Sequence, residues 1–215
     1  MSDIRLYIEG GGDQKNTMAA FRKAISLLFG RLIGTYAQRL RVVACGGRDE
    51  AIDYCINAVA EHAEDFCFLL IDSDMPVMGT TLQHYQRLKR GKEILCVAGV
   101  ASEYLLHLMV QCMEAWVVAD PKGLARACGE AGFHAKALPV SVDPESIMKD
   151  DFETIMKSAT KDTELGEYEK IDHLWIIFQS VDVEVVGRRC GHLDALCSVL
   201  ELPSATLRQI VATRR

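Results

Sequence analysis

The sequence predicts an α/β protein in which a mostly parallel sheet is flanked by helices and followed by a helical C-terminal extension. Short strand-like segments at 4–8, 41–44 and 66–71 alternate with helix-like segments. This alternation is typical of parallel strands joined by right-handed crossover helices. The segment 66–71 is a continuous apolar run, which indicates a strand buried on both faces. Beyond Pro139 the sequence is helical throughout.

The first strand, 4–8, is rich in residues that favour strands and stops at Glu9 and three glycines, which predict a tight turn. We expect Asp13 to cap the next helix and Gly30 to end it. Apolar residues recur in that helix at helical spacing, at Met18, Phe21, Ile25 and Leu28. Gly46 and Gly47 break the second strand in the same way, before another helix.

The later elements follow from the same patterns. In order, we expect a helix over 51–63, a polar loop with a short helix over 73–92, strands over 94–100 and 105–110, and a helix over 113–119 that stops before Pro121. Helices are expected over 151–159, 172–179, 183–188, 192–200 and 204–214. We therefore divide the chain into an α/β domain over 1–138 and a helical extension over 139–215 packed on it. The apolar faces of the extension suit either the completion of the core or a homodimer interface.

Composition excludes several classes of protein. The 215 residues are 49% hydrophobic and 25% charged with only 5 Pro, unlike a disordered or fibrous chain. No apolar run reaches the roughly 18 to 20 residues that span a bilayer. The 8 Cys form no C-x-x-C pair, and the N-terminus lacks the basic region of a secretory signal, so we expect reduced thiols in a cytoplasmic protein. The net charge of −6 argues against attraction of the whole surface to nucleic acid, but not against local basic patches.

Acidic residues follow two of the predicted strands. Glu9 ends the first strand, and Asp72 and Asp74 end the third. Because parallel strands end at one edge of a sheet, we expect the three carboxylates to meet there. Two carboxylates about 4 Å apart repel by about 4 kcal/mol at an effective dielectric near 20, so a cation must offset them. Mg²⁺ or Mn²⁺ suits an all-oxygen site, so we expect the metal ion at Glu9, Asp72 and Asp74. The alternative is that the aspartates cap the next element and Glu9 is a solvated strand end.

A strand that ends in Glu9-Gly10, followed by an apolar strand that ends in Asp72-Ser73-Asp74, resembles the Toprim fold of topoisomerases, primases and overcoming-lysogenization-defect nucleases. The chain more narrowly resembles a Toprim-like family of unknown function, whose members are often encoded beside ATPases in bacterial phage-defence loci. The segments that carry this likeness are 6–13, 44–48, 70–76, 107–116, 148–151 and 166–170. The resemblance thus covers most of the chain.

The resemblance implies a metal-dependent nuclease that hydrolyses phosphodiesters in DNA or RNA with Mg²⁺ or Mn²⁺. It implies that Glu9 acts as general acid or base and that Asp72 and Asp74 hold the metal. It also implies a defence role with a partner ATPase. An alternative function is a non-catalytic binding or regulatory subunit of such an ATPase.

Further residues are candidates for the same site. Glu114 lies in an apolar setting beside Trp116, where a carboxylate needs a cation or metal, although it also suits a helix start. Arg48 follows two glycines at a helix start and is a candidate phosphate ligand or a surface arginine. Lys170 and Lys149 are candidates to neutralise charge on a phosphate, with solvated lysines as the alternative.

A basic group in the loop is a candidate patch for contact with the nucleic-acid backbone, or else a solvated face. Its members are Arg87, Lys89, Arg90 and Lys92. His173 is a further candidate, whereas His107 is expected to be structural. The sequence has no Walker or G-x-G-x-x-G motif, which argues against those modes of nucleotide binding. A phospho-receiver domain also has an aspartate at its third strand, but it needs an acidic pair after the first strand, where this chain has Glu9 and three glycines.

Overall fold

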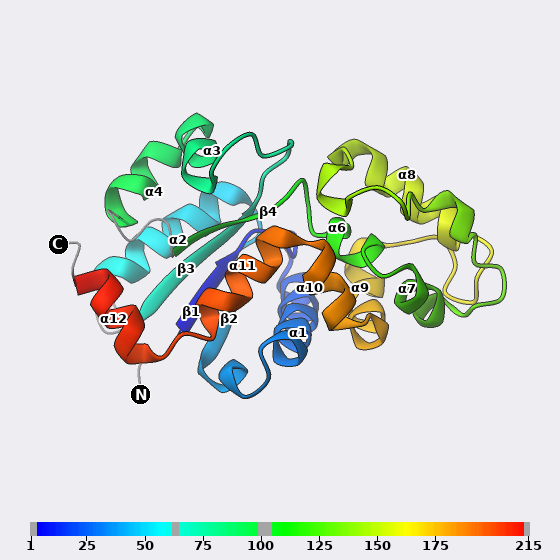
Figure 1. Cartoon of the computed structure of the whole chain (residues 1–215), viewed down its shortest axis with the longest axis horizontal. Helices are drawn as coiled ribbons and strands as arrows, with labels where there is room; N and C mark the ends of the chain where they lie inside the picture. The colour runs from blue at the N-terminus through cyan, green and yellow to red at the C-terminus, as the bar shows by residue number, and fades with distance from the viewer. Residues whose placement is uncertain (1–3, 62–64, 99–104, 213–215) are drawn as a thin grey trace.

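The computed structural model describes residues 4–61, 65–98 and 105–212 (Figure 1). Its sheet has the strand order β2-β1-β3-β4, and every pair of neighbours is parallel. The strands are β1 (Ile4–Ile8), β2 (Leu40–Ala44), β3 (Phe66–Asp72) and β4 (Leu106–Met109). All residues of β3 are buried, as the apolar run predicts. The predicted α/β class with a parallel sheet is therefore confirmed.

Helices cover both faces of the sheet (Figure 1). Because side chains alternate along a strand, Leu6 and Phe68 pack into one hydrophobic core and Tyr7 and Leu69 into another. The first core includes side chains of α1 (Lys15–Leu32), α9 (Lys170–Ser180), α10 (Val183–Arg189), α11 (Gly191–Leu200) and α12 (Ser204–Ala212). The second includes side chains of α2 (Arg48–Glu61), α3 (Thr81–Arg87) and α4 (Gly91–Ala98).

A third group of helices lies beyond the ends of β3 and β4, on the right of Figure 1. It contains α6 (Glu114–Val118), α7 (Pro121–Cys128) and α8 (Lys149–Thr160). Short 3-10 segments complete the order: η1 (Gly34–Arg39), η3 (Ala135–Ala137) and η4 (Pro144–Ser146). The carboxyl ends of the strands thus face helices from a later part of the chain.

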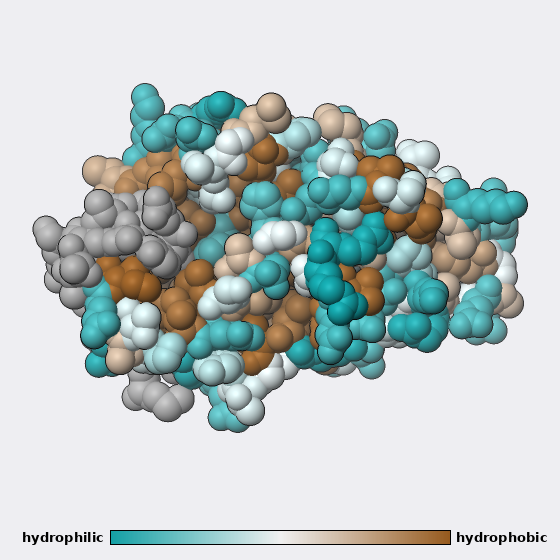
Figure 2. Space-filling view, viewed as in Figure 1, coloured by the Kyte–Doolittle hydropathy of each residue, from teal (hydrophilic) through white to brown (hydrophobic). Residues whose placement is uncertain are grey.

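The helices of the C-terminal extension pack on the sheet and on α1 rather than apart from them. Leu174, Ile177 and Phe178 of α9 are buried, and α9 lies against α1. The helix α11 lies against β4. The apolar faces of these helices therefore complete the core within the chain. Figure 2 shows mostly hydrophilic side chains on the face that carries α10 and α11, with smaller apolar areas between them.

Several local expectations are wrong, each for a physical reason. Residues 94–98 belong to α4, where Ile94 is buried and Glu93 pairs with Arg90, so the apolar run is a helix face; 99–100 lie outside the described residues. The expected helix that stops before Pro121 is confirmed as α6, but the pattern predicts no helix directly after it, whereas Pro121 begins α7, because proline is favoured in the first turn of a helix. Gln14, not Asp13, precedes α1, which continues past Gly30.

The structure also bears on the expected thiols and on the expected lack of a membrane-spanning segment. All eight cysteines are free thiols, seven of them buried. No helix within the described ranges combines the length and the apolarity needed to cross a bilayer.

Candidate functional site at the carboxyl edge of the sheet

The parallel register brings Glu9 and Asp72 into contact. Ile8 is paired with Leu70, and the Glu9 N–H donates to the Leu70 carbonyl over 3.0 Å. The Asp72 N–H in turn donates to Glu9 Oε2 over 3.1 Å. Asp74 lies two residues after the end of β3. It is linked to Glu9 through Arg48 and to Asp72 through Lys149. We call Glu9, Asp72 and Asp74 the acidic edge, and the sequence predicted that they would meet.

Two glycines make the turn that brings Arg48 to the acidic edge. Gly10 and Gly46 form an antiparallel bridge, with N···O distances of 2.7 and 3.0 Å. Gly10 has φ +130°, and a Cβ on it would lie 2.6 Å from the Phe21 ring. Only glycine fits this position, because a larger residue meets both a disfavoured backbone conformation and a buried ring.

The Asp72–Asp74 turn is fixed through Ser73, whose backbone and side chain are both hydrogen-bonded. The Ser73 N–H donates to the Met109 carbonyl over 2.9 Å, and Ser73 Oγ accepts from the Gln111 N–H over 2.7 Å. The Ser73 carbonyl lies 3.1 Å from His84 Nε2. Burial lowers the pKa of His84, so its neutral ring donates through Nε2. Sequence reasoning did not single out Ser73 or His84 as supports for the acidic edge.

Arg48, the first residue of α2, spans the acidic edge. Its Nε donates to Glu9 Oε2 over 3.2 Å, and its Nη2 donates to the Asp72 carbonyl over 2.9 Å and to Asp74 Oδ2. Burial disfavours the guanidinium charge, but Glu9 and Asp74 outweigh it and raise the Arg48 pKa. Arg48 is therefore a half-buried partner of the carboxylates and not the surface arginine of the alternative interpretation.

Lys149, the first residue of α8, reaches the acidic edge from the opposite side. Its Nζ lies 2.9 Å from Asp72 Oδ2 and also donates to Asp74 Oδ1. Burial lowers the Lys149 pKa, but the two aspartates outweigh it and raise the pKa overall. A lysine distant in sequence thus neutralises two of the three carboxylates, and its expected contact with a phosphate stays a prediction.

The carboxylates of the acidic edge differ in their titration. Burial, followed by the charge of Asp72, raises the pKa of Glu9. Burial also raises the pKa of Asp72, which is 8% exposed, despite the nearby Lys149 and Lys170. Burial acts in the same direction on Asp74, but hydrogen bonds from Lys149 and Arg48 outweigh it and lower the Asp74 pKa. Asp74 is therefore the best-compensated carboxylate of the three.

A second ion pair lies beside the acidic edge. Glu114, at the start of α6, is 8% exposed, and its Oε2 accepts from Lys170 Nζ over 2.9 Å. Lys170 also acts electrostatically on Asp72, and Glu114 on the same carboxylate. The Tyr168 hydroxyl is buried and has no hydrogen-bond partner among the described residues. Burial, followed by the charge of Glu114, raises its pKa. Glu114 thus meets a cation, as the sequence predicted.

The cations that balance these carboxylates in the structure are side chains, where the sequence predicted a divalent ion. Across the described ranges, no three His, Cys, Asp or Glu side chains are grouped so that they could hold one metal ion. Arg48 and Lys149 account for this, because they lie between Glu9, Asp72 and Asp74. The donors are nevertheless hard carboxylate oxygens, which match Mg²⁺ in chemistry. A metal ion at the acidic edge therefore requires that a basic side chain first leaves it.

The loop basics differ in the contacts that they make within the chain. Arg90 ties α2 to α4 through Asp53, Glu93 and the Asp49 carbonyl, so its guanidinium is occupied. Arg87 and Lys89 are exposed. A hollow of about 370 Å³ beside α2 is lined by Arg48, Asp49, Glu50, Ile52, Leu88, Lys89 and Arg90. Lys89 and Arg48 thus line one hollow that adjoins the acidic edge.

The two histidine candidates lie apart from the acidic edge. His107 is buried within β4 and stacks on Phe68, with ring centroids 6.0 Å apart, as expected for a structural histidine. His173 Nδ1 accepts from the Glu169 N–H over 3.0 Å at the start of α9. The position and the contact of His173 favour a role in holding the helix start.

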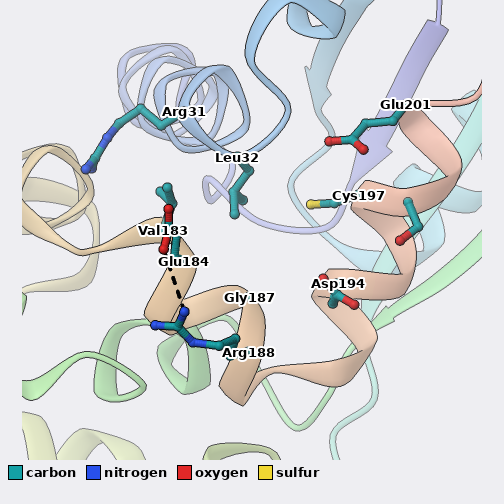
Figure 3. A pocket seen from close by; sticks show the side chains of 10 residues that line it. Arg31, Leu32, Val183, Glu184, Gly187, Arg188, Asp194, Cys197 and Glu201 are labelled. Carbon is teal, nitrogen blue, oxygen red and sulfur yellow. Dashed lines mark ion pairs between the residues drawn. The ribbon is translucent and has the colours of Figure 1, made fainter.

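A separate hollow of about 500 Å³ lies between α1, α10 and α11 (Figure 3). Arg188 pairs with Glu184 across 3.6 Å at its wall, Asp194 and Cys197 come from α11, and Glu201 follows the end of that helix. It shares no lining residue with the acidic edge, and most of its polar side chains are exposed to solvent. The convergent buried charges are thus at the acidic edge and not in this hollow.

Comparisons with known proteins identify one family, whose model covers most of the chain. Neither a curated protein nor a solved structure matches it. The family model described as "Domain of unknown function (DUF4276)" matches residues 8–201, a span that includes Glu9, Arg48, Asp72, Asp74, Glu114, Lys149 and Lys170. The chain therefore belongs to the DUF4276 family.

Proposed function

We propose that this protein is a Toprim-like, Mg²⁺- or Mn²⁺-dependent hydrolase of phosphodiesters in DNA or RNA. The observation that carries the proposal is the convergence of Glu9 with Asp72 and Asp74 at the carboxyl edge of a parallel sheet. Ligands of such sheets bind at this edge. The resemblance of the Glu9-Gly10 and Asp72-Ser73-Asp74 segments to Toprim nucleases supports the same chemistry.

Asp72 and Asp74 would hold the metal, with Glu9 beside them. The bound ion would polarise a phosphoryl oxygen and lower the pKa of a water molecule. Burial raises the pKa of Glu9, which suits a general base that must accept a proton near neutral pH. Arg48 and Lys149 offer N–H donors for phosphate oxygens, and Lys170 offers a third cation beside Asp72.

The proposed cellular role extends the same resemblance. It is an effector of a bacterial phage-defence system in the cytoplasm, with a partner ATPase. Reconstitution with that ATPase would test whether hydrolysis by the acidic edge depends on it.

A second candidate is a non-catalytic binding or regulatory subunit. The observation that favours it is that Arg48 and Lys149 already neutralise the acidic edge without a metal ion. Under this alternative the ion pairs stabilise the fold, and Mg²⁺ neither binds nor raises the melting temperature. A ligand at 100 times its dissociation constant would otherwise add about 2.7 kcal/mol of stability.

The test is cleavage of labelled single-stranded and duplex DNA and RNA with Mg²⁺, Mn²⁺ or a chelator. We expect metal-dependent cleavage that falls by about 10² to 10⁴ in Glu9→Gln and in Asp72→Asn. Asp65→Asn is the matched control, because Asp65 lies immediately before β3, at its other end, and pairs with Arg5. Cleavage that survives Asp72→Asn would reveal a contaminant and contradict the proposal. Mg²⁺ binding without cleavage of any substrate would favour the regulatory subunit.

A further inference from the structure

Lys149 and Arg48 share the acidic edge but are held there in different ways. Arg48 is anchored by the Asp72 main-chain carbonyl, 2.9 Å away, as well as by Glu9 and Asp74. Among the described residues, the Lys149 ammonium donates to the carboxylates of Asp72 and Asp74 and to no main-chain carbonyl. The Lys149 side chain is 36% exposed and has a flexible four-carbon stem. Lys149 is therefore the cation that can leave without breaking a main-chain contact.

The same carboxylate oxygens have two alternative partners. Asp72 Oδ2 and Asp74 Oδ1 accept from Lys149, and these are oxygens that a divalent cation at the proposed metal site would need. A metal ion and the ammonium repel each other and compete for the same lone pairs. Once displaced, the Lys149 ammonium lacks its anion, and a phosphate oxygen is a suitable replacement.

We propose that Lys149 is an exchange cation, which leaves Asp72 and Asp74 when metal binds and then binds a phosphate of the nucleic acid. This inference rests on the proposed function. The ion pair must be broken once, whether metal or phosphate arrives first. Each ligand therefore removes the obstacle to the other, and the two bind cooperatively. By linkage, the factor by which metal raises nucleic-acid affinity equals the factor by which nucleic acid raises metal affinity.

The arrangement of α8 supports an exchange over a fixed structural pair. Lys149 is the first residue of α8, and Asp150 and Asp151 follow it in the first turn. The Lys149 ammonium thus bridges the group formed by α6, α7 and α8 to the carboxyl edge of the sheet, where the substrate of such a fold enters.

Two binding measurements on the full chain test the exchange. Mn²⁺ binding is followed by electron paramagnetic resonance without nucleic acid. Binding of a short fluorescein-labelled single-stranded DNA is followed by anisotropy, in Ca²⁺ and in chelator. For the wild type we expect Ca²⁺ to raise DNA affinity about 10-fold, within the usual range of coupling between sites. The DNA should raise Mn²⁺ affinity by a similar factor.

Lys149→Met should act in opposite directions on the two ligands. Mn²⁺ should bind about 10-fold more tightly without DNA, because no ammonium competes for the carboxylates. DNA should bind more weakly in Ca²⁺, because a phosphate ligand is lost, and the coupling factor should fall. Lys157→Met is the matched control, since Lys157 lies in the same helix and pairs with Glu153 and Glu167. Lys157→Met should change the affinities for Mn²⁺ and for DNA by less than about two-fold, because an exposed ion pair contributes little.

The outcomes separate this inference from the proposed function. If Lys149→Met binds Mn²⁺ no more tightly than the wild type, or binds DNA with equal affinity in Ca²⁺, the exchange is wrong while the proposed function stands. If the wild type binds neither Mn²⁺ nor nucleic acid, both are wrong. Lys149→Gln is the second variant, and circular dichroism checks that each variant is folded.

Discussion

Asp74 and Gln111 both have left-handed backbone conformations and are joined by a hydrogen bond. Their φ angles are 59° and 61°, and they are the two non-glycine residues with positive φ among the described residues. The Asp74 N–H donates to the Gln111 carbonyl over 3.3 Å. Such conformations cost about 1 to 3 kcal/mol each and are concentrated at functional sites. Here they aim the Asp74 carboxylate at Arg48 and Lys149.

The left-handed backbone makes the choice of substitution at Asp74 decisive. Asparagine tolerates this conformation nearly as well as aspartate, whereas alanine does not. We expect Asp74→Ala to be less stable than Asp74→Asn by about 1 kcal/mol, since both lose the ion pairs and only alanine adds strain. Urea unfolding at one pH measures the difference. Equal stabilities would show that the turn relaxes and carries no strain.

The opposite pKa shifts of Asp72 and Asp74 predict opposite effects of neutralising them. Burial raises the Asp72 pKa above its value in the unfolded chain, so ionised Asp72 destabilises the fold at neutral pH. The Asp74 pKa is lowered, because the hydrogen bonds from Lys149 and Arg48 outweigh burial, so ionised Asp74 stabilises the fold. At pH 7 we expect Asp72→Asn to melt a few degrees above the wild type and Asp74→Asn a few degrees below it. About 1 kcal/mol corresponds to ~2 to 4 °C in a domain of this size.

The pH dependence has a defined sign for each variant. As pH falls from 7 through the raised pKa of Asp72, the wild type gains stability relative to Asp72→Asn. As pH falls through the lowered pKa of Asp74, the wild type loses its advantage over Asp74→Asn. Melting temperatures between pH 7 and pH 4 follow the first change. A wild type that stays equally distant from Asp72→Asn across that range would contradict the assignment to Asp72.

The glycine turn predicts a contrast between two glycine-to-alanine variants. Gly10→Ala places a Cβ 2.6 Å from the Phe21 ring at φ +130°, so we expect a loss of about 3 kcal/mol or more. Gly30→Ala is the control, since nothing lies within 4 Å of its added Cβ and Gly30 is within α1. It should stabilise the protein by about 0.5 to 1 kcal/mol. A mild effect of Gly10→Ala on urea unfolding would disprove the tight packing of this turn.

The Tyr168 hydroxyl, on a side chain 4% exposed, is buried without a partner among the described residues. An unsatisfied buried polar group costs about 1 to 3 kcal/mol, so we expect Tyr168→Phe to be at least as stable as the wild type. Thermal unfolding of the two proteins measures this. A clear loss of stability in Tyr168→Phe would show that the hydroxyl is hydrogen-bonded in solution, with Glu114 as the nearby acceptor to examine.

Much of the fold was predictable because its signals are local. The apolar run of β3 indicates a buried strand, and the glycines after Glu9 and Cys45 indicate tight turns. The parallel sheet then places Glu9 and Asp72 at one edge, whatever the side chains around them. The helix α7 was not predictable in this way, since Pro121 suits both the end of one helix and the start of another.

The partners of the acidic edge were only partly predictable, because they depend on tertiary contacts. Lys149 lies 77 residues from Asp72 in sequence, and no periodicity links them. His84 supports the Ser73 carbonyl from α3, within the segment 73–92 for which the sequence predicts a polar loop with a short helix. Arg90 carries the same charge as Arg48, yet it is engaged with Asp53 and Glu93. The sequence identifies the basic residues that are candidates for the site. Which carboxylate each of them contacts depends on the tertiary fold.

The most direct test of a divalent site is a crystal grown with Mn²⁺ and a short oligonucleotide, measured for anomalous scattering. We expect an anomalous peak within coordination distance of Asp72 and Asp74, with Lys149 turned toward a phosphate oxygen. Bound oligonucleotide with no Mn²⁺ peak, and with Lys149 still paired to both aspartates, would contradict the account.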